Sequence, residues 1–211
     1  LLAQRLTVEQ CQRVRYFDIE TNDTWARDHA ALTLKCGGEF KYLDFKFNGW
    51  GEKFAWQKDN AITKKMAEQQ AFSGVVEDHN DFVLEGGSIE SDGEGTILTT
   101  SFCLLAPHRN QPLTQEELEL RLKNMLHADR ILWLNYGRLL GDDTDGHIDT
   151  IVRMAPNNTL LYVACEDKTD EQYEDFKAME EELKQLRTRK GAPYRLIPLP
   201  FPDAIIADGE R

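Results

Sequence analysis

The stretch Gly141-Asp-Asp-Thr-Asp-Gly-His-Ile-Asp-Thr150 gathers several carboxylates and one histidine into a single loop. Apolar runs typical of strands flank it, Ile131-Leu-Trp-Leu134 before it and Leu160-Leu-Tyr-Val163 after it. A loop at the end of a strand is held over a site by the sheet beneath it. Within the loop, His147 and Asp149 are two residues apart, so in extended backbone their side chains point the same way. An imidazole beside a carboxylate indicates general acid/base chemistry, and a solvated acidic turn is the alternative interpretation.

The composition is that of a soluble globular protein. The chain has 211 residues, of which 29% are charged and 41% are hydrophobic, and its net charge is −12. This negative charge argues against nucleic acid or an acidic membrane as a partner and favours a cationic ligand. No apolar run in the sequence approaches the length of a membrane span, and no signal peptide is visible.

The four cysteines indicate a reducing compartment. Cys11, Cys36, Cys103 and Cys165 are widely spaced and contain no Cys-x-x-Cys pair, so the sequence suggests neither a disulfide framework nor a zinc site. We therefore expect a cytoplasmic protein. Cys103 lies in the apolar segment Ser101-Phe-Cys-Leu-Leu105, where we expect a strand in which the thiol packs as a small hydrophobic group.

The order strand, acidic turn, hairpin, helix occurs three times along the chain. The expected strands are 14–19, 31–34, 42–47, 81–84, 88–90, 96–100, 130–134, 151–154, 160–164 and 194–199. The expected helices run from an Asp59 cap to about residue 71, from a Thr114 cap to about residue 127, and over 170–189 after a Thr169 cap.

This order predicts an α/β fold with radial repetition. The acidic turns at Asp28, Glu85 and His147 are separated by 57 and 62 residues, and a repeat of about 60 residues is too long for a solenoid but fits a propeller-like arrangement. The expected modules are 14–75, 76–128 and 129–190, and 191–211 would begin a fourth. The three acidic turns would then meet at one axis. Two separate domains without internal symmetry are the alternative.

Each of the other acidic or aromatic turns has two interpretations. Trp25-Ala-Arg-Asp28 offers a ring and a carboxylate that suit a planar cation, or else a buried Trp25 beside a local Arg27–Asp28 ion pair. Glu85-Gly-Gly87 lets a ligand or another backbone come close, but an ordinary hairpin kink has the same sequence. Phe47-Asn-Gly-Trp-Gly51 is suited to a pocket wall or to simple packing.

The sequence predicts no metal site. Aligning Gly146 with the glycine of an EF-hand loop places Gly141 and Val152 at its first and last positions, where acidic ligands are required. Zinc needs more nitrogen or sulfur ligands than His147 alone supplies in this segment.

Four segments together resemble the agmatine deiminase family, whose bacterial members are also labelled peptidyl-arginine deiminases. They are Asn22-Asp-Thr-Trp-Ala-Arg-Asp28, Phe47-Asn-Gly-Trp-Gly51, Leu84-Glu-Gly-Gly-Ser-Ile-Glu90 with Asp92-Gly-Glu-Gly95, and Gly141-Asp-Asp-Thr-Asp-Gly-His-Ile-Asp149. They occur in the family's order, and the similarity covers essentially residues 14 to 200. The family belongs to the guanidino-modifying pentein superfamily. The resemblance therefore implies a five-bladed α/β propeller of strand-strand-helix-strand modules, of which roughly three are expected here.

The resemblance also implies a mechanism. In the family, a cysteine thiolate attacks the guanidinium carbon of the substrate and forms a covalent thiouronium intermediate, while a histidine shuttles protons. By motif match, His147 is that histidine and Glu85 is the acidic residue that orients and charges it. Asp28 and Asp149 match the two aspartates that grip the guanidinium. No metal or cofactor is implied.

Two further residues are assigned to the substrate by the same match. Trp25 matches a tryptophan that contacts the substrate, and Asp143 lies where the family tends to carry an acidic residue for the far amine of agmatine. The expected activity is hydrolysis of agmatine to N-carbamoylputrescine and ammonia, which feeds putrescine synthesis, and a homo-oligomer is possible. The alternatives are the same chemistry on arginine or peptidyl-arginine, and a non-catalytic guanidinium-binding or interaction protein on the same scaffold.

The sequence departs from the family at the nucleophile. The family's cysteine belongs to a Gly-rich His-Cys motif near its C-terminus, and none of the four cysteines here matches that motif. Because the chain also starts at Leu1 instead of Met, we expect a fragment of a longer enzyme that lacks the nucleophile.

Overall fold

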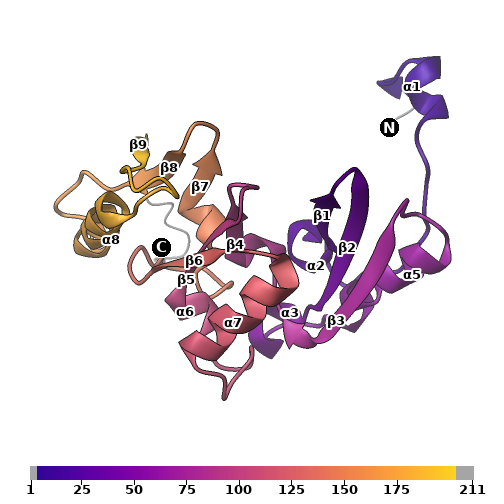
Figure 1. Cartoon of the computed structure of the whole chain (residues 1–211), viewed down its shortest axis with the longest axis horizontal. Helices are drawn as coiled ribbons and strands as arrows, with labels where there is room; N and C mark the ends of the chain where they lie inside the picture. Colours follow the sequence, from indigo (N-terminus) through magenta and orange to yellow (C-terminus); the bar gives the residue numbers. More distant parts are fainter. Residues whose placement is uncertain (1–3, 203–211) are drawn as a thin grey trace, which may run out of the picture.

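Three small sheets of three strands each follow one another along the chain (Figure 1). The computed structural model describes residues 4–202. In each sheet two consecutive strands pair antiparallel, and the third strand returns after a helical segment to pair parallel with the second. The strands are β1 (Leu32–Cys36), β2 (Glu39–Lys46), β3 (Val75–Val83), β4 (Ile89–Ser91), β5 (Thr96–Thr100), β6 (Arg130–Leu134), β7 (Val152–Ala155), β8 (Thr159–Ala164) and β9 (Arg195–Pro200). The expected strand-strand-helix-strand α/β architecture is confirmed.

Most of the helices are short and lie between the second and third strands of a sheet. The α-helices are α1 (Val8–Gln12), α2 (Ala26–His29), α3 (Gly49–Glu52), α4 (Gln57–Asn60), α5 (Ile62–Glu68), α6 (Ser101–Leu104), α7 (Gln115–Leu126) and α8 (Tyr173–Gln185). Two 3₁₀ turns, η2 (Gly86–Ser88) and η3 (Ile148–Thr150), carry residues of the acidic loops.

Helix α7 forms where the sequence predicts it. The Thr114 hydroxyl accepts a hydrogen bond from the Glu117 backbone N–H at 3.3 Å, and the Glu117 carboxylate accepts one from the Thr114 N–H at 2.8 Å. This reciprocal capping satisfies two N–H groups that a helix start otherwise leaves unpaired. Leu118, Leu122 and Leu126 recur at helical spacing and form the buried face of the helix.

Two predictions in the first module are wrong. Residues 14–19 have no regular secondary structure, because no described strand pairs with them. Asp59 does not start a long helix but lies inside α4, where its side chain is 1% exposed. Its carboxylate accepts hydrogen bonds from the backbone N–H groups of Asn22 at 2.6 Å and Asp23 at 3.2 Å. Asp59 therefore fixes the segment that leads into the first acidic turn.

Two later predictions are also wrong. Thr169 does not cap α8, which begins at Tyr173, because its hydroxyl donates instead to Asp167 within a turn. Cys103 lies on helix α6 and not on a strand, since the Thr100 side chain accepts from the Cys103 N–H and starts a helical turn at the end of β5. The Cys103 thiol is buried as expected.

The three sheets span residues 32–83, 89–134 and 152–200. The module limits expected from the sequence remain a prediction. Residues 1–3 and 203–211, and with them the end of the expected start of a fourth module (191–211), lie outside the described residues.

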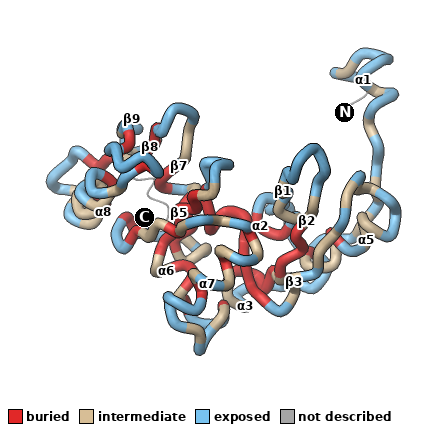
Figure 2. The backbone as a smooth tube through the Cα atoms, in the orientation of Figure 1, coloured by how far each residue is buried: buried red, intermediate tan, exposed pale blue. Residues whose placement is uncertain are grey.

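Strand β5 separates two hydrophobic cores. Ile97 packs in the cluster that contains Leu43, Phe82 and the buried face of α7, whereas Leu98 packs in the cluster that contains Leu160 and Phe176. Successive side chains of a strand point to opposite faces, so the middle sheet is covered on both sides. Buried residues are concentrated around this middle sheet (Figure 2). The loops at the ends of β5 and β6 therefore start from a sheet that is covered on both sides.

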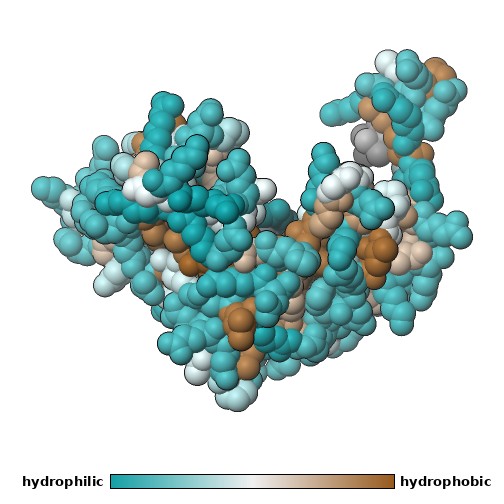
Figure 3. Space-filling model, viewed as in Figure 1, coloured by the Kyte–Doolittle hydropathy of each residue, from teal (hydrophilic) through white to brown (hydrophobic). Residues whose placement is uncertain are grey.

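The sheets are arranged along the long axis of the molecule, with β1–β3 toward one end and β7–β9 at the other (Figure 1). The space-filling view is hollowed between these two ends (Figure 3). Within residues 4–202, none of the helices has the length and apolar character that a membrane crossing requires.

Candidate functional site

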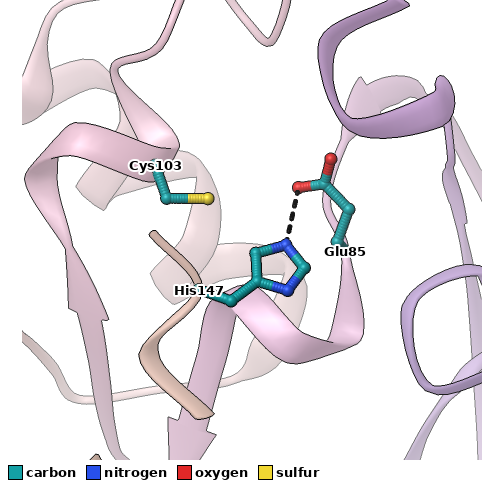
Figure 4. A group of neighbouring side chains, drawn as sticks. All are labelled: Glu85, Cys103 and His147. Atoms are coloured by element: carbon teal, nitrogen blue, oxygen red, sulfur yellow. Dashed lines mark ion pairs between the residues drawn. The ribbon is translucent and has the colours of Figure 1, made fainter. Parts of the chain in front are cut away.

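Glu85, Cys103 and His147 come from different loops and point toward one another (Figure 4). Glu85 follows β3, Cys103 lies in α6 directly after β5, and His147 immediately precedes η3. One carboxylate oxygen, the sulfur and one imidazole nitrogen all lie within 4.8 Å of one another. The three residues are 0%, 0% and 2% exposed. Two sheets and the loop after the second sheet therefore build one buried polar cluster.

Gly87 marks the point where Asp28, His147 and Asp149 meet. A β-carbon on Gly87 would lie 2.5 Å from His147 Nδ1, 2.6 Å from Asp28 Oδ1 and 3.1 Å from Asp149 Oδ2. His147 Nδ1 is 3.5 Å from Asp28 Oδ1, and its Nε2 is 3.8 Å from Glu85 Oε2. The structure thus brings together the four residues predicted to form the site. Because glycine has no β-carbon, Gly87 lets His147, Asp28 and Asp149 come this close together.

Asp28 is held in place by two hydrogen bonds. The Gly87 N–H donates to Oδ1 at 3.0 Å, and the Trp50 indole N–H donates to Oδ2 at 3.1 Å. Trp50 reaches Asp28 from a tight turn in which its own φ is 55° and the Asn48 side chain accepts from the Gly51 N–H. The sequence allowed only a pocket wall or packing for this turn. It gave no sign that the indole would orient a carboxylate.

Arg109 is a site residue that the sequence interpretation missed. Its Nε is 3.0 Å from Glu85 Oε1, and both side chains are only 1% exposed. The other end of the guanidinium donates to Asp145 Oδ2 at 2.8 Å and to the Thr144 carbonyl at 3.0 Å. Arg109 therefore ties Glu85 to the loop that carries His147. No motif includes it, and only its two anionic neighbours, which are distant in sequence, reveal its role.

The surroundings of His147 hold it in its charged form. Burial alone lowers the pKa of His147, but the Cys103 side chain and the Glu85 carboxylate outweigh burial and raise that pKa to about 11. The Glu85 carboxylate, 3.8 Å from Nε2, therefore favours the charged form of His147. Burial raises the pKa of the Cys103 thiol, and His147 offsets this only in part. Cys103 is therefore a neutral thiol at neutral pH.

The loop around His147 is shaped by its own polar residues. The Asp142 carboxylate accepts from the Thr144 N–H at 3.0 Å and from the Gly146 N–H at 2.7 Å. The Thr144 hydroxyl in turn accepts from the His147 N–H at 3.0 Å. Gly146 has a φ of 91°, and a β-carbon there would clash with the Phe102 ring. Much of the acidity of this loop therefore serves its own conformation.

Two of the predicted substrate residues, Trp25 and Asp143, are exposed, and their contacts with a substrate remain a prediction. Trp25 is 59% exposed and starts α2, so it is not the buried tryptophan of the alternative interpretation either. Asp143 is exposed, and its backbone carbonyl accepts from Lys53 at 2.7 Å.

The Asp149 carboxylate lies 3.8 Å from Arg27. Burial raises the pKa of the Asp149 carboxyl, while His147 opposes that rise.

One group of described residues could hold a metal ion, namely Glu85, Cys103 and His147. The sequence predicted no metal site because only ligands close to His147 along the chain could be counted. Cys103 lies far from the 141–150 loop along the chain, and folding places its sulfur beside the imidazole.

Comparison with protein families gives one match over nearly the whole chain. Residues 2–211 match the model of the Porphyromonas-type peptidyl-arginine deiminases. A protein of Marinomonas sp. (strain MWYL1), named "Putative agmatine deiminase", is 38% identical over 205 residues, which cover 94% of this chain and 54% of the relative. The chain thus spans about half the length of this curated relative.

Two solved structures are similar along almost the entire chain. The "Putative Arginine Deiminase" of Porphyromonas gingivalis is 45% identical, with a TM-score of 0.93, over 100% of this chain and 62% of that one. The agmatine deiminase of C. jejuni with substrate bound is 39% identical, with a TM-score of 0.85, over 96% of this chain and 60% of that one.

Proposed function

Because the chain belongs to the family of Porphyromonas-type peptidyl-arginine deiminases, we propose that the protein containing it hydrolyses agmatine to N-carbamoylputrescine and ammonia. One observation carries the proposal. Two carboxylates, Asp28 and Asp149, converge with His147 around Gly87. A flat guanidinium offers N–H groups to carboxylates on its edges, so this arrangement suits it better than a spherical cation.

In this proposal each residue has a distinct role. Asp28, oriented by Trp50 and the Gly87 N–H, accepts hydrogen bonds from one side of the guanidinium, and Asp149 accepts them from another. His147 is a cation beside Glu85, so it can give a proton to the departing ammonia. As a neutral imidazole it can then take a proton from the water that completes the hydrolysis. Glu85 stabilises the protonated ring, which exists before the first transfer and again after the second.

The proposal also needs a thiolate to attack the guanidinium carbon. Cys103 does not suit this role, because it is fully buried and burial raises its pKa, whereas reactive cysteines are accessible and have lowered pKa values. None of the four cysteines of the chain matches the family's nucleophile motif. Activity is therefore tested on the protein that contains these 211 residues.

Arginine and peptidyl-arginine remain the second candidate substrates, because the P. gingivalis relative and the matching family are named for them. We expect agmatine to react at least ten times faster than arginine, since the α-carboxylate of arginine would enter a site lined by carboxylates. Ammonia release measured on agmatine, arginine and a peptidyl-arginine, at equal concentrations, distinguishes them. Equal or higher rates with arginine or the peptide would assign the protein to the second class.

The product of the proposed reaction is a precursor of putrescine, and we place the reaction in the cytoplasm. Within residues 4–202, none of the four cysteines forms a disulfide bond, which is usual in a reducing compartment.

Changing Gly87 to alanine should reduce ammonia release from agmatine by about 100-fold, because displacing reacting groups by about 1 Å costs that much. The new methyl group would lie 2.5–3.1 Å from His147, Asp28 and Asp149, so these side chains must move apart. Gly93→Ala is the control, since a β-carbon there meets nothing within 4 Å. Gly93→Ala strains a turn but leaves the site in place. Equal activity of the two variants would contradict the location of the site.

A further inference from the structure

We infer that Glu85, Cys103 and His147 form a binding site for a soft divalent metal ion, and that Zn²⁺ is the ion that fits it best. A thiolate sulfur, an imidazole nitrogen and a carboxylate oxygen are all common zinc ligands. Ca²⁺ and Mg²⁺ instead need about six or more oxygen ligands, which this trio does not offer. Three protein ligands leave the fourth position of a tetrahedral zinc ion for water or a small ligand.

The distances allow this with small movements. Zinc–ligand bonds of about 2.0–2.3 Å place tetrahedral ligand atoms about 3.3–3.8 Å apart. His147 Nε2 is 3.8 Å from Glu85 Oε2, and the complete set of ligand atoms lies within 4.8 Å. Side-chain rotations that draw the sulfur in by less than about 1 Å therefore complete the coordination. The sulfur starts from a weak contact, 3.8 Å from the Thr144 carbonyl, so little is lost when it turns.

The second independent observation is the state of the His147 ring. Nε2 is buried and makes no hydrogen bond to any residue in 4–202. Nδ1 lies 3.5 Å from Asp28 Oδ1, on the opposite edge of the ring. A metal-binding histidine usually directs its other ring N–H to a carboxylate, which fixes the tautomer and aims the free nitrogen at the metal. Asp28 supplies such a carboxylate, and Nε2 faces the Cys103 sulfur and Glu85 (Figure 4).

Charge balance also favours the site. Arg109 contacts Glu85, but Arg109 is itself paired with Asp145 at 2.8 Å, so its charge is already shared. Binding releases the thiol proton of Cys103 and the Nε2 proton of His147. The two anionic ligands then neutralise the doubly charged ion, and no oxidation or reduction is involved.

The expected consequence is inhibition, and this part rests on the proposed function. A metal ion on Nε2 removes the lone pair through which His147 would exchange protons. Zinc would therefore block the deiminase reversibly, and a chelator would restore it. The binding itself does not depend on which substrate the protein uses, so it is measured separately.

The test is binding of Co²⁺ and Zn²⁺ to the protein that contains this chain, with Cys103→Ser and Cys165→Ser compared. Co²⁺ bound to a thiolate gives a charge-transfer absorption band, which we expect in the unmutated protein and expect Zn²⁺ to remove. Cys103→Ser should abolish the band and weaken zinc binding, measured by competition with a chromophoric chelator, at least tenfold. Cys165 is also buried but belongs to the cluster with Leu160 and Phe176, which does not include Cys103, so Cys165→Ser should change neither result.

Two outcomes would overturn the inference. The first is a cobalt–thiolate band that persists in Cys103→Ser, because another cysteine would then be the ligand. The second is the absence of any such band in the unmutated protein. Where Cys103→Ser does not fold, as judged by circular dichroism, Cys103→Ala keeps the apolar packing and removes the same ligand.

Activity gives a second readout that separates this inference from the proposed function. We expect zinc to slow ammonia release in the unmutated protein and in Cys165→Ser, each compared with its own metal-free rate. A protein that shows the cobalt band but releases no ammonia from any guanidino substrate would refute the proposed function and leave the metal site standing. A protein that releases ammonia but shows no cobalt band would support the proposed function and refute the metal site.

Discussion

Replacing His147 with asparagine should reduce ammonia release from agmatine by about 10²–10⁴-fold, the usual contribution of a general acid and base. Asparagine has nearly the size of histidine but cannot carry a proton between leaving group and water. In the folded protein His147 is 2% exposed and lies between Glu85 and Asp28. Solvent is therefore poorly placed to replace it, and the loss should appear in kcat more than in KM.

His108→Asn is the matched control. His108 is an exposed histidine, with 64% of its side chain accessible, and its φ of 60° is one that asparagine tolerates well. We expect its activity to be unchanged. Circular dichroism and thermal unfolding of both variants separate a lost reaction step from a lost fold.

Asp149→Asn tests the carboxylate that lies with His147 at Gly87. It removes a charge that would face the guanidinium but keeps the shape of the side chain, so substrate binding should weaken together with the rate. Near-normal turnover by a well-folded His147→Asn or Asp149→Asn protein would remove that residue from the proposed mechanism.

The parts of the fold that follow from local chemistry could be predicted from the sequence. Thr114 and Glu117 define the start of α7 by themselves, and the short apolar or β-branched runs at 96–100 and 130–134 give β5 and β6 directly. Residues 14–19 show the limit of this reasoning. Their alternation fits a strand, but a strand also needs a partner, and partners are decided by the tertiary fold.

The site was predictable only where a motif carries it. Asp28, Glu85, His147 and Asp149 stand in recognisable segments, and they do converge. Trp50 also stands in such a segment, but the segment did not reveal that its indole contacts Asp28. Arg109 and Cys103 stand in no such pattern, and each contacts site residues that are distant in sequence. The sequence correctly predicted that Cys103 is buried, but it did not predict that the thiol lies beside His147. A buried thiol can contact apolar groups or an imidazole equally well.

Replacing Arg109 with methionine should lower the free energy of unfolding by about 3–5 kcal/mol, the usual cost of removing one partner of a buried ion pair. Glu85 would then keep a buried charge without its partner, because both side chains are only 1% exposed. The same substitution also removes the hydrogen bonds to Asp145 and the Thr144 carbonyl, so the loop that carries His147 should loosen. Urea unfolding followed by circular dichroism measures the change.

Arg189→Met is the control for this substitution. Arg189 pairs with Asp129 at 2.5 Å, but their side chains are 47% and 61% exposed. A solvated pair of this kind contributes about 1 kcal/mol or less.

A double variant isolates the role of charge. Adding Glu85→Gln to the Arg109→Met protein removes the buried charge that Arg109→Met left unpaired. We therefore expect Glu85→Gln to lower the free energy of unfolding less in the Arg109→Met protein than in the unmutated protein. If the two side chains stabilised the fold only by packing, their effects on the free energy of unfolding would instead be additive. If Arg109→Met were as mild as Arg189→Met, Arg109 could not be the residue that holds Glu85 against His147.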